Sequence, residues 1–269
     1  MKIVVQKFGG AAVANTQRIN DIVKHVEYAK NRNFFPVIVV SAMAGTTNYL
    51  IQLCQQANSL SSNKSDVNAV NLLDTTQNAV DVYNREKDVA LHTGEVITAS
   101  LTAITLAKHA ISAKSILGWQ IPIRTSSDFG KAIIENIETS HILECLNQKI
   151  IPIIPGFQGI DQDNNITTLG RGGSDITATA IAAAIKAEKV EFYKDVPGVY
   201  DIDPRLSKKA KLIKQISHEN MLELSKAGSK VLHPRAVEIA MRYNIPLEIL
   251  SVFREYTLNG ASNEGTIVN

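Results

Sequence analysis

The segment "TTLGRGGSDITATAIAAAIKAEKV", residues 167–190, places three glycines, an arginine, a serine and an aspartate directly before an alanine-rich helical segment. A helix cap accounts for Ser174 and Asp175, since a serine accepts amide hydrogen bonds and an aspartate opposes the helix dipole. A cap does not require three glycines, because each one costs chain entropy. A glycine turn at a helix N-terminus directs several amide N–H groups at one point, so the segment predicts a site for an anionic ligand.

The segment "KFGG" sets Lys7 at the end of a β-rich run and Gly9 and Gly10 in the turn that follows. Ligands of open α/β sheets collect at the carboxyl ends of the strands, where such a lysine would lie. The spacing fits neither the GxxxxGK[ST] phosphate loop nor the GxGxxG dinucleotide motif. Taken alone, the segment is more typical of a surface lysine beside an ordinary turn.

The segment "SAMAGTTN", residues 41–48, repeats this arrangement after a second β-rich run. Thr46 or Thr47 could simply cap the helix that follows. In "HTGEVITAS", Glu95 stands near another expected helix start, where the helix dipole alone favours a carboxylate. Each of these segments by itself is more often structural than functional.

The segment "YKDVPGVYDIDPR", residues 193–205, is an expected strand followed by a turn and two further aspartates. It lacks the glycine and the terminal glutamate of an EF-hand loop, so a loop that contacts a nucleotide suits it better than a calcium site. "AGSKVLHPRAVEIA" places Lys230 between a glycine and a helix, and we expect His233 at the helix entry rather than on a metal. In this order along the chain, the five segments supply several N–H donors and two lysines, which predicts a polyphosphate site.

The composition bounds the class of protein. The 269 residues are 45% hydrophobic and 20% charged, enough for a sizeable core in one large or two closely joined domains. A net charge of +2 with dispersed basic residues argues against nucleic acid or an anionic membrane as partner. Cys54 and Cys145 are expected to be buried free thiols, and without a cleavable leader or an apolar stretch of transmembrane length we expect a cytoplasmic protein.

β-rich runs alternate with helical periodicity along the chain, and the polar stretch 55–65 is its most loop-like region. The expected strands are residues 2–8, 34–42, 113–119, 150–157, 190–196 and 246–251. The expected helices include residues 19–26, 95–110, 175–187, 221–227 and 231–243. The alternation predicts an α/β protein with a mostly parallel sheet covered on both faces. We expect an N-terminal lobe to about residue 155 for the smaller ligand and a C-terminal lobe for the nucleotide.

The segments "KFGG", "SAMAGTTN", "TTLGRGGSDITATAIAAAI", "KDVPGVYDIDPR" and "GSKVLHPRAVEIA" together resemble the characteristic segments of the aspartokinases, in the amino acid kinase family. The match spans almost the whole chain in the family's order. It implies a three-layer αβα sandwich of the carbamate kinase-like type as a single domain over residues 1–269. It also implies that L-aspartate reacts with MgATP to give 4-phospho-L-aspartate and ADP, at the start of the route to lysine, threonine, methionine and diaminopimelate.

The resemblance implies a role for individual residues. Lys7 would bridge the transferring phosphoryl group, and Asp175 would orient the active-site lysines. Arg171 would bind the α-carboxylate of aspartate as a planar fork. The other aspartate-binding residues would be Thr47, Glu95, Phe157 and Ser174. The ATP-binding residues would be Lys7, Gly9, Gly10, Lys194, Asp195, Tyr200, Arg205 and Lys230. Mg²⁺ would ride on the ATP phosphates with few protein ligands, so no separate metal site is expected.

The chain departs from the family pattern in three places. Ala11 and Ala12 stand where Thr-Ser is usual, which removes two hydroxyls expected near the phosphates. Lys194 stands where a threonine or serine is common, although lysine also occurs there. The chain stops at Asn269, after a "GT" segment that usually leads into paired ACT domains. The resemblance therefore implies an aspartokinase catalytic domain without ACT domains, expected to form a homo-oligomer, most simply a homodimer.

Two alternatives stay open from the sequence. One is an amino acid kinase that phosphorylates another carboxylate acceptor. The other is a weakly active nucleotide-binding protein that regulates a partner, which the alanine pair keeps open.

Overall fold

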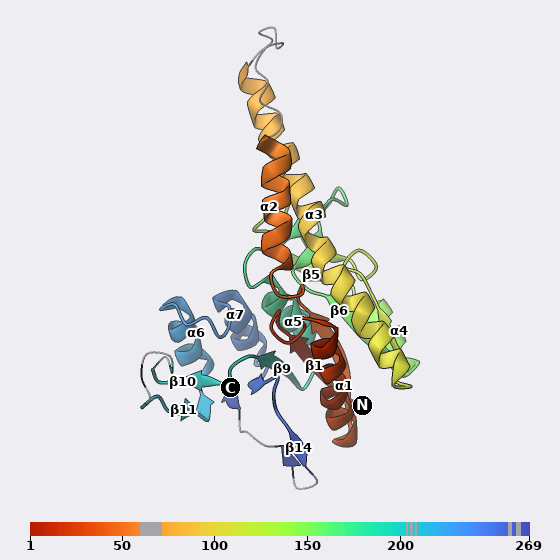
Figure 1. Cartoon of the computed structure of the whole chain (residues 1–269), viewed down its shortest axis with the longest axis vertical. Helices are drawn as coiled ribbons and strands as arrows, with labels where there is room; N and C mark the ends of the chain where they lie inside the picture. Colours follow the sequence, from red (N-terminus) through yellow and green to blue (C-terminus); the bar gives the residue numbers. More distant parts are fainter. Residues whose placement is uncertain (60–71, 203, 205–206, 208, 258–259, 262–264) are drawn as a thin grey trace.

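A central sheet of eight strands organises the computed structural model, which describes all residues except 60–71, 203, 205, 206, 208, 258, 259 and 262–264 (Figure 1). Its strands, in spatial order, are β12 (Gln215–Ile216), β16 (Thr266–Val268), β13 (Leu247–Ser251), β9 (Lys189–Lys194), β1 (Lys2–Phe8), β2 (Phe34–Val40), β6 (Ile151–Pro155) and β3 (Ala113–Ser115). Every pairing is parallel except that of β13 with β16. The expected mostly parallel sheet is confirmed.

Side chains alternate between the two faces of this sheet, because successive residues of a strand point in opposite directions. Val37 and Val39 of β2 join the apolar cluster that includes α5, whereas Ile38 and Val40 join the cluster that includes α1. Both faces are therefore apolar, which explains why the inner strands read as continuous hydrophobic runs instead of an alternating pattern.

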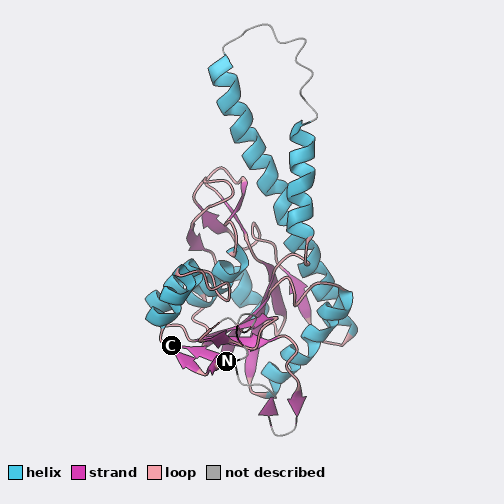
Figure 2. Cartoon of the chain, turned by 60° about the vertical axis from the view of Figure 1, so that its left-hand side comes forward, coloured by secondary structure: helices cyan, strands magenta, loops and turns pink. Residues whose placement is uncertain are grey.

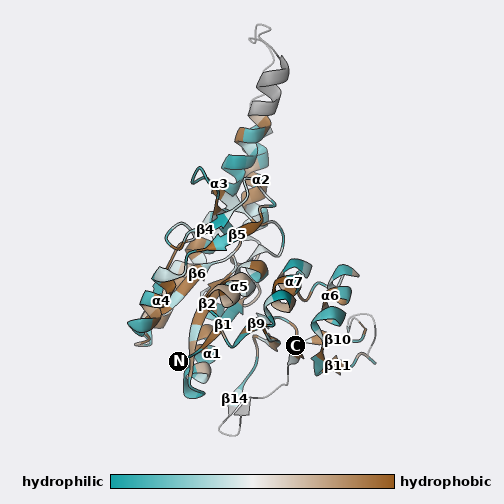
Figure 3. Cartoon of the chain, turned by 180° about the vertical axis from the view of Figure 1, so that it is seen from behind, coloured by the Kyte–Doolittle hydropathy of each residue, from teal (hydrophilic) through white to brown (hydrophobic). Residues whose placement is uncertain are grey.

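Helices cover both faces and complete a three-layer αβα sandwich, as expected. The helices are α1 (Thr16–Asn31), α2 (Thr46–Ser59), α3 (Leu72–Lys108), α4 (Ser140–Asn147), α5 (Gly173–Ala184), α6 (His218–Lys226) and α7 (Pro234–Tyr243). The α1 and α3 helices pack on one face, while α5, with α7 against it, packs on the other. In Figure 3 the central strands are largely hydrophobic and the surrounding helices carry both polar and apolar residues.

A smaller sheet lies beside the main one. Its strands, in spatial order, are β5 (Ile134–Ile137), β4 (Ile123–Thr125), β7 (Gln158–Ile160) and β8 (Ile166–Thr168). Two short pairs complete the strands, β10 (Val199–Tyr200) with β11 (Leu212–Ile213) and β14 (Tyr256–Thr257) with β15 (Gly260–Ala261). The main sheet is continuous across the proposed lobe boundary near residue 155, which stays a prediction.

The α2 and α3 helices leave the body side by side, as Figures 1 and 2 show. Among the described residues, the part of α3 from 79 to 108 is long and apolar enough to cross a membrane by length and composition alone. The expectation that no stretch reaches that length was therefore wrong. Here α3 packs against α1, β3 and β6 and carries two buried carboxylates, Asp88 and Glu95, as a helix of a folded core does.

Several element boundaries differ from the expectation. α2 continues to Ser59, so the first part of the expected loop 55–65 is helical and the rest lies outside the described residues. The strand expected over 113–119 ends at Ser115. The last helix begins at Pro234 rather than residue 231, because proline suits the first helical position and His233 caps it by accepting a hydrogen bond from the Arg235 amide. Both cysteines are free as expected, with Cys145 buried and Cys54 only partly so.

Candidate active site

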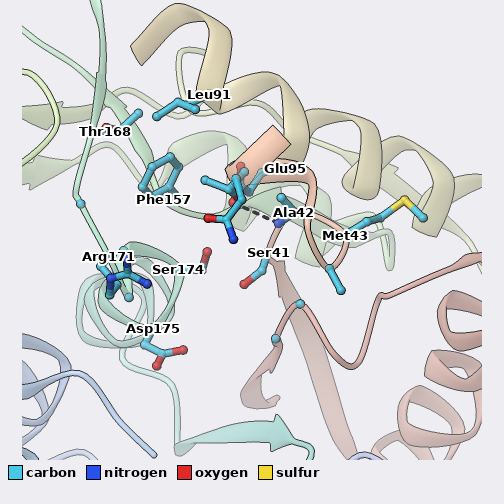
Figure 4. Close-up of a pocket in the computed structure, with 18 of the residues that line it drawn as sticks. Ser41, Ala42, Met43, Leu91, Glu95, Phe157, Thr168, Arg171, Ser174 and Asp175 are labelled. Atoms are coloured by element: carbon cyan, nitrogen blue, oxygen red, sulfur yellow. Dashed lines mark hydrogen bonds between the residues drawn. The ribbon is translucent and has the colours of Figure 1, made fainter. Parts of the chain in front are cut away.

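A cavity of about 700 Å³ lies where β2, β1 and β9 end and α5 begins. Figure 4 shows Ser41 and Ala42 on one side of it and Arg171, Ser174 and Asp175 on the other. The sequence-predicted residues on its wall are Lys7, Gly9, Gly10, Thr47, Glu95, Phe157, Arg171, Ser174, Asp175, Lys194, Asp195 and Lys230. The structure thus brings together residues as far apart in the sequence as Lys7 and Lys230. The individual roles of these residues stay predictions.

Strand alternation sets the direction of the two lysines. Lys7 lies two residues after Val5, and Lys194 two residues after Phe192, and both apolar side chains belong to the cluster on the α5 face. β1 and β9 are parallel neighbours, so their carboxyl ends lie together. Both ammonium groups therefore point toward the start of α5.

Asp175, in the first turn of α5, forms ion pairs with both lysines. Lys7 Nζ lies 2.6 Å from Asp175 Oδ1, and Lys194 Nζ lies 2.8 Å from Oδ2. Burial disfavours the charged form of this carboxyl, but the two lysines outweigh it and lower the Asp175 pKa to about 2. Burial lowers the Lys7 pKa to about 8 despite the attraction of Asp175. The charges of Lys7, Lys194 and Asp175 sum to +1, so this part of the cavity wall is suited to an anionic ligand.

The glycine turn before α5 has the geometry that only glycine adopts easily. Gly170 and Gly172 have φ angles of +80° and +74°, in the left-handed region. A Cβ at Gly170 would lie 2.9 Å from the Gly130 carbonyl oxygen. Gly172 is the N-cap of α5, so the alternative in which Ser174 caps this helix was wrong, because Ser174 already lies within its first turn.

Arg171 stands between these two glycines and lines the cavity. Its side chain is exposed, and within the part of the chain that the structure describes no carboxylate pairs with it. An unpaired guanidinium on the wall of a cavity is suited to a carboxylate or phosphate ligand, which it can bind with two parallel hydrogen bonds.

Glu95 extends from α3 into the opposite wall. Its Oε1 accepts a hydrogen bond of 3.0 Å from the Ala42 amide, drawn as the dashed line in Figure 4. Gly94 permits this approach, since a Cβ there would lie 2.9 Å from the Ala42 Cβ. Glu95 Oε2 is buried and has no hydrogen-bond partner among the described residues, and burial raises the pKa of this carboxyl to about 7. The free oxygen is suited to a ligand that carries an N–H group.

Phe157 is held in a strained conformation on the cavity wall. Its φ angle is +71°, a region that bulky side chains avoid. The conformation is held by a hydrogen bond of 3.0 Å from its amide to Thr177 Oγ1 and one of 2.9 Å from the Leu169 amide to its carbonyl oxygen. Strain retained beside a cavity is typical of functional positions.

The two alanines that replace the usual Thr-Ser occupy different environments. Ala11 is exposed and lines the cavity, whereas Ala12 is fully buried in the apolar cluster with Phe8 and Val13. The expectation that both positions lie near the phosphates was therefore wrong for Ala12, because the turn directs its side chain into the core.

Some expected residues do not line this cavity, and others were missed. Tyr200 lies in β10 and is not among the lining residues, while Arg205 lies outside the described residues. Ser41 was not singled out, although its position directly after a buried strand in "SAMAGTTN" was a usable signal. Lys87 and Leu91 of α3 also line the cavity, and no motif in the sequence marks them.

Comparison with known proteins gives a consistent picture. The family model described as the amino acid kinase family matches residues 2–251. The aspartokinase of Rickettsia prowazekii (strain Madrid E) is 47% identical over 268 residues, covering 100% of this chain and 55% of the relative. The chain therefore spans about half the length of the curated relatives it matches.

Two solved structures are similar to the whole chain. The aspartate kinase of Synechocystis has a TM-score of 0.78 at 35% identity and covers 99% of this chain and 39% of that one. E. coli aspartokinase III in complex with aspartate and ADP has a TM-score of 0.80 at 28% identity and covers 99% of this chain and 64% of that one.

Replacement of Glu95 by glutamine is expected to change how stability depends on pH. Because the folded protein binds the Glu95 proton more tightly than the unfolded chain, the stability that Glu95 contributes to the wild type is lost as pH rises from about 4.5 to about 7. The Glu95→Gln variant lacks this loss, so its advantage over wild type should grow by about 3 kcal/mol across that range. Urea unfolding at a series of pH values measures the difference, with the exposed Glu135→Gln as control. Parallel wild-type and Glu95→Gln curves would contradict the shifted pKa.

Proposed function

The chain belongs to the amino acid kinase family, and we propose that it transfers the γ-phosphoryl group of MgATP to the side-chain carboxylate of L-aspartate. The products are 4-phospho-L-aspartate and ADP. The identity to curated aspartokinases and the similarity to an aspartokinase bound to aspartate and ADP support the choice of substrates. The observation that carries the proposal is that two lysines at the carboxyl ends of parallel strands form ion pairs with the same buried aspartate.

The chemistry of this transfer suits such a site. A carboxylate is already a nucleophile, so no general base is required, and catalysis reduces to in-line positioning and neutralisation of phosphoryl charge. Lys7 is held at the end of β1 and bridges the transferring group, and Lys194 adds a second cation 2.8 Å from the same aspartate. Asp175 fixes both ammonium groups without neutralising them together.

The amino acid lies between two groups that the protein leaves unpaired. Arg171 binds the α-carboxylate, and the free Oε2 of Glu95 accepts from the α-ammonium group. Thr47, Ser174 and the ring of Phe157 complete the walls of this subsite. This arrangement favours a free amino acid over an N-acylated one, whose neutral amide would not offset the charge of Glu95.

The nucleotide phosphates lie at the other end of the cavity. Gly9 keeps the backbone close to Lys7, since a Cβ there would lie 3.5 Å from Lys7 Nζ, and Gly10, Asp195 and Lys230 line the same cavity. The proposal also includes Tyr200 and Arg205 among the residues that contact the nucleotide. We infer that Mg²⁺ enters as part of MgATP, on the ATP phosphates. Within the described residues, no group of three His, Cys, Asp or Glu side chains is arranged to hold a metal. When bound, Mg²⁺ neutralises phosphate charge.

The proposal has three further parts that follow from the family. The product enters the biosynthesis of lysine, threonine, methionine and diaminopimelate. The protein acts in the cytoplasm. It forms a homo-oligomer, most simply a homodimer.

The experiment that tests the activity is hydroxylamine trapping of the acyl phosphate. The protein is incubated with MgATP and L-aspartate, L-glutamate or N-acetyl-L-glutamate, and hydroxamate and ADP are measured in parallel. We expect hydroxamate from L-aspartate in a one-to-one ratio to ADP. Hydroxamate from another acid instead would change the acceptor, and ATP binding without hydroxamate from any acid would overturn the proposed reaction.

Loss of either Lys7 or Asp175, which form an ion pair at the carboxyl end of β1, should reduce turnover. We expect Lys7→Ala to lower kcat about 10²- to 10³-fold, the usual effect of removing one group that stabilises transition-state charge. Asp175→Asn should also lower kcat. It should move the decline of kcat/KM for ATP at high pH to lower pH, because Asp175 raises the Lys7 pKa.

The matched controls are Lys114→Ala, an exposed lysine in β3, and Asp163→Asn, an exposed aspartate after β7. Initial rates over a range of pH give both parameters. A Lys7→Ala variant with near wild-type kcat, or an unmoved high-pH decline in Asp175→Asn, would refute these roles.

Exchange of Arg171 for lysine should act mainly on the amino acid. A lysine keeps the charge but loses the bidentate fork, so we expect the KM for L-aspartate to rise about tenfold while the KM for ATP changes little. Arg242→Lys, on the exposed side of α7, is the control. An unchanged KM for L-aspartate would place the carboxylate anchor elsewhere.

A further inference from the structure

Asp88 is a fully buried carboxylate in the middle of α3 that does not line the cavity. Its neighbours Lys87 and Leu91 on the same helix do line it. A buried carboxylate is costly unless it is fully bonded, so its partners indicate what it holds in place.

Among the described residues, three groups donate to Asp88, and they come from two segments that border the cavity. Its Oδ2 accepts from the Thr168 amide at 2.7 Å and from the Gly130 amide at 2.8 Å, and its Oδ1 accepts from Thr168 Oγ1 at 2.8 Å. Burial raises the Asp88 pKa, and these hydrogen bonds oppose the rise. The carboxylate thus ties α3 to the end of β8 and to the loop after β4.

Arg235 bonds the same two segments through their carbonyl groups. Its Nη1 donates to the Leu169 carbonyl oxygen at 3.2 Å, and its Nη2 donates to that of Ala132 at 2.9 Å. Arg235 lies in the first turn of α7. Between the two charged groups, the Ala132 amide donates to the Thr168 carbonyl oxygen at 2.9 Å.

The segment held in this way leads directly into the turn that carries Arg171. Leu169 precedes Gly170, which approaches the Gly130 carbonyl so closely that a Cβ would not fit. Arg171 itself has no side-chain partner among the described residues. Its position is therefore set by the backbone on either side of it.

We propose that Asp88 and Arg235 are positioning residues for Arg171, holding the 168–172 turn from two sides through its amide and carbonyl groups. Neither residue touches the reacting atoms. The effect on the amino acid rests on the proposed function, whereas the effect on the backbone does not. Loss of either group should misplace the carboxylate anchor while leaving Lys7 and Asp175 in place.

The chain contains a matched control at the other end of the same β7–β8 hairpin. Asp161 is also a buried carboxylate that accepts backbone N–H groups, from Asp163 at 3.0 Å and Asn165 at 2.8 Å. It lies at the far turn of the hairpin, between β7 and β8, and does not line the cavity. Asp161→Ala therefore removes a comparable interaction without touching the 168–172 turn.

The experiment compares Asp88→Ala, Asp88→Asn, Arg235→Lys and Asp161→Ala by steady-state kinetics and by hydrogen exchange of the folded protein. We expect Asp88→Ala to raise the KM for L-aspartate about tenfold or more, with kcat and the KM for ATP within about threefold. Asp88→Asn should restore near wild-type KM. Its amide oxygen can accept both backbone N–H groups while the Thr168 hydroxyl reverses to accept from its nitrogen.

Hydrogen exchange provides a readout that does not depend on the substrate. Exchange should be faster in peptides covering 128–132 and 168–173 in Asp88→Ala. In Asp161→Ala it should be faster in peptides covering 160–166 and around Ser127, whose side chain also bonds Asp161, and unchanged at 168–173. If Asp88→Ala does not fold, Arg235→Lys carries the same test, since a single ammonium nitrogen on a shorter side chain replaces the two guanidinium nitrogens that bond the two carbonyl groups separately.

Three outcomes would overturn the proposal: equal KM effects of Asp88→Ala and Asp161→Ala, a fall in kcat alone, or unchanged exchange at 168–173. If the wild type forms no hydroxamate from L-aspartate, the proposed function fails and the exchange data alone decide whether the turn is held as described.

Discussion

The sharing of one buried carboxylate by two lysines is the constraint on which the rest of the site depends. Asp175 lies 2.6 Å from Lys7 and 2.8 Å from Lys194, and all three groups are mostly shielded from water. A single unpaired charge at this depth would be very unfavourable. The carboxyl ends of β1 and β9 and the first turn of α5 must therefore lie next to one another. The parallel order of the central strands and the left-handed glycines before α5 both serve this convergence.

The opposite face of the same two strands also carries polar side chains, which are linked by hydrogen bonds and ion pairs. Gln6 Nε2 and the Tyr193 hydroxyl each donate to Glu191 Oε2 at 2.9 Å, and Lys189 lies 2.8 Å from Glu191 Oε1. β1 and β9 thus carry paired buried charges on both faces near the centre of an otherwise apolar sheet. Such networks are sensitive to register, because a shift of one residue would reverse the face of every side chain.

Much of the fold and of the cavity wall could be predicted from the sequence, because the informative signals were local. The apolar runs at 2–8 and 34–42 gave strands, and glycine turns after strands marked the residues at their ends. The contacts of Asp88 could not be predicted, since a lone aspartate in a helix pattern has no motif and its partners lie 42 and 80 residues away. The core position of Ala12 was missed for a similar reason, because the direction of a side chain in a turn depends on tertiary packing.

The charged groups of this region divide into two kinds, and the division itself describes the ligand. Asp88 and Arg235 are bonded to backbone, and Asp175 is bonded to lysines, so these groups hold structure. Arg171 and the Oε2 of Glu95 have no partner among the described residues, although each lies on the cavity wall. A ligand that satisfies both must carry an anion toward Arg171 and an N–H donor toward Glu95, and it must leave a further anionic group near the lysines. A free amino acid with an acidic side chain has this arrangement of charge, whereas a ligand without an amino group would leave the Glu95 oxygen buried and unpaired.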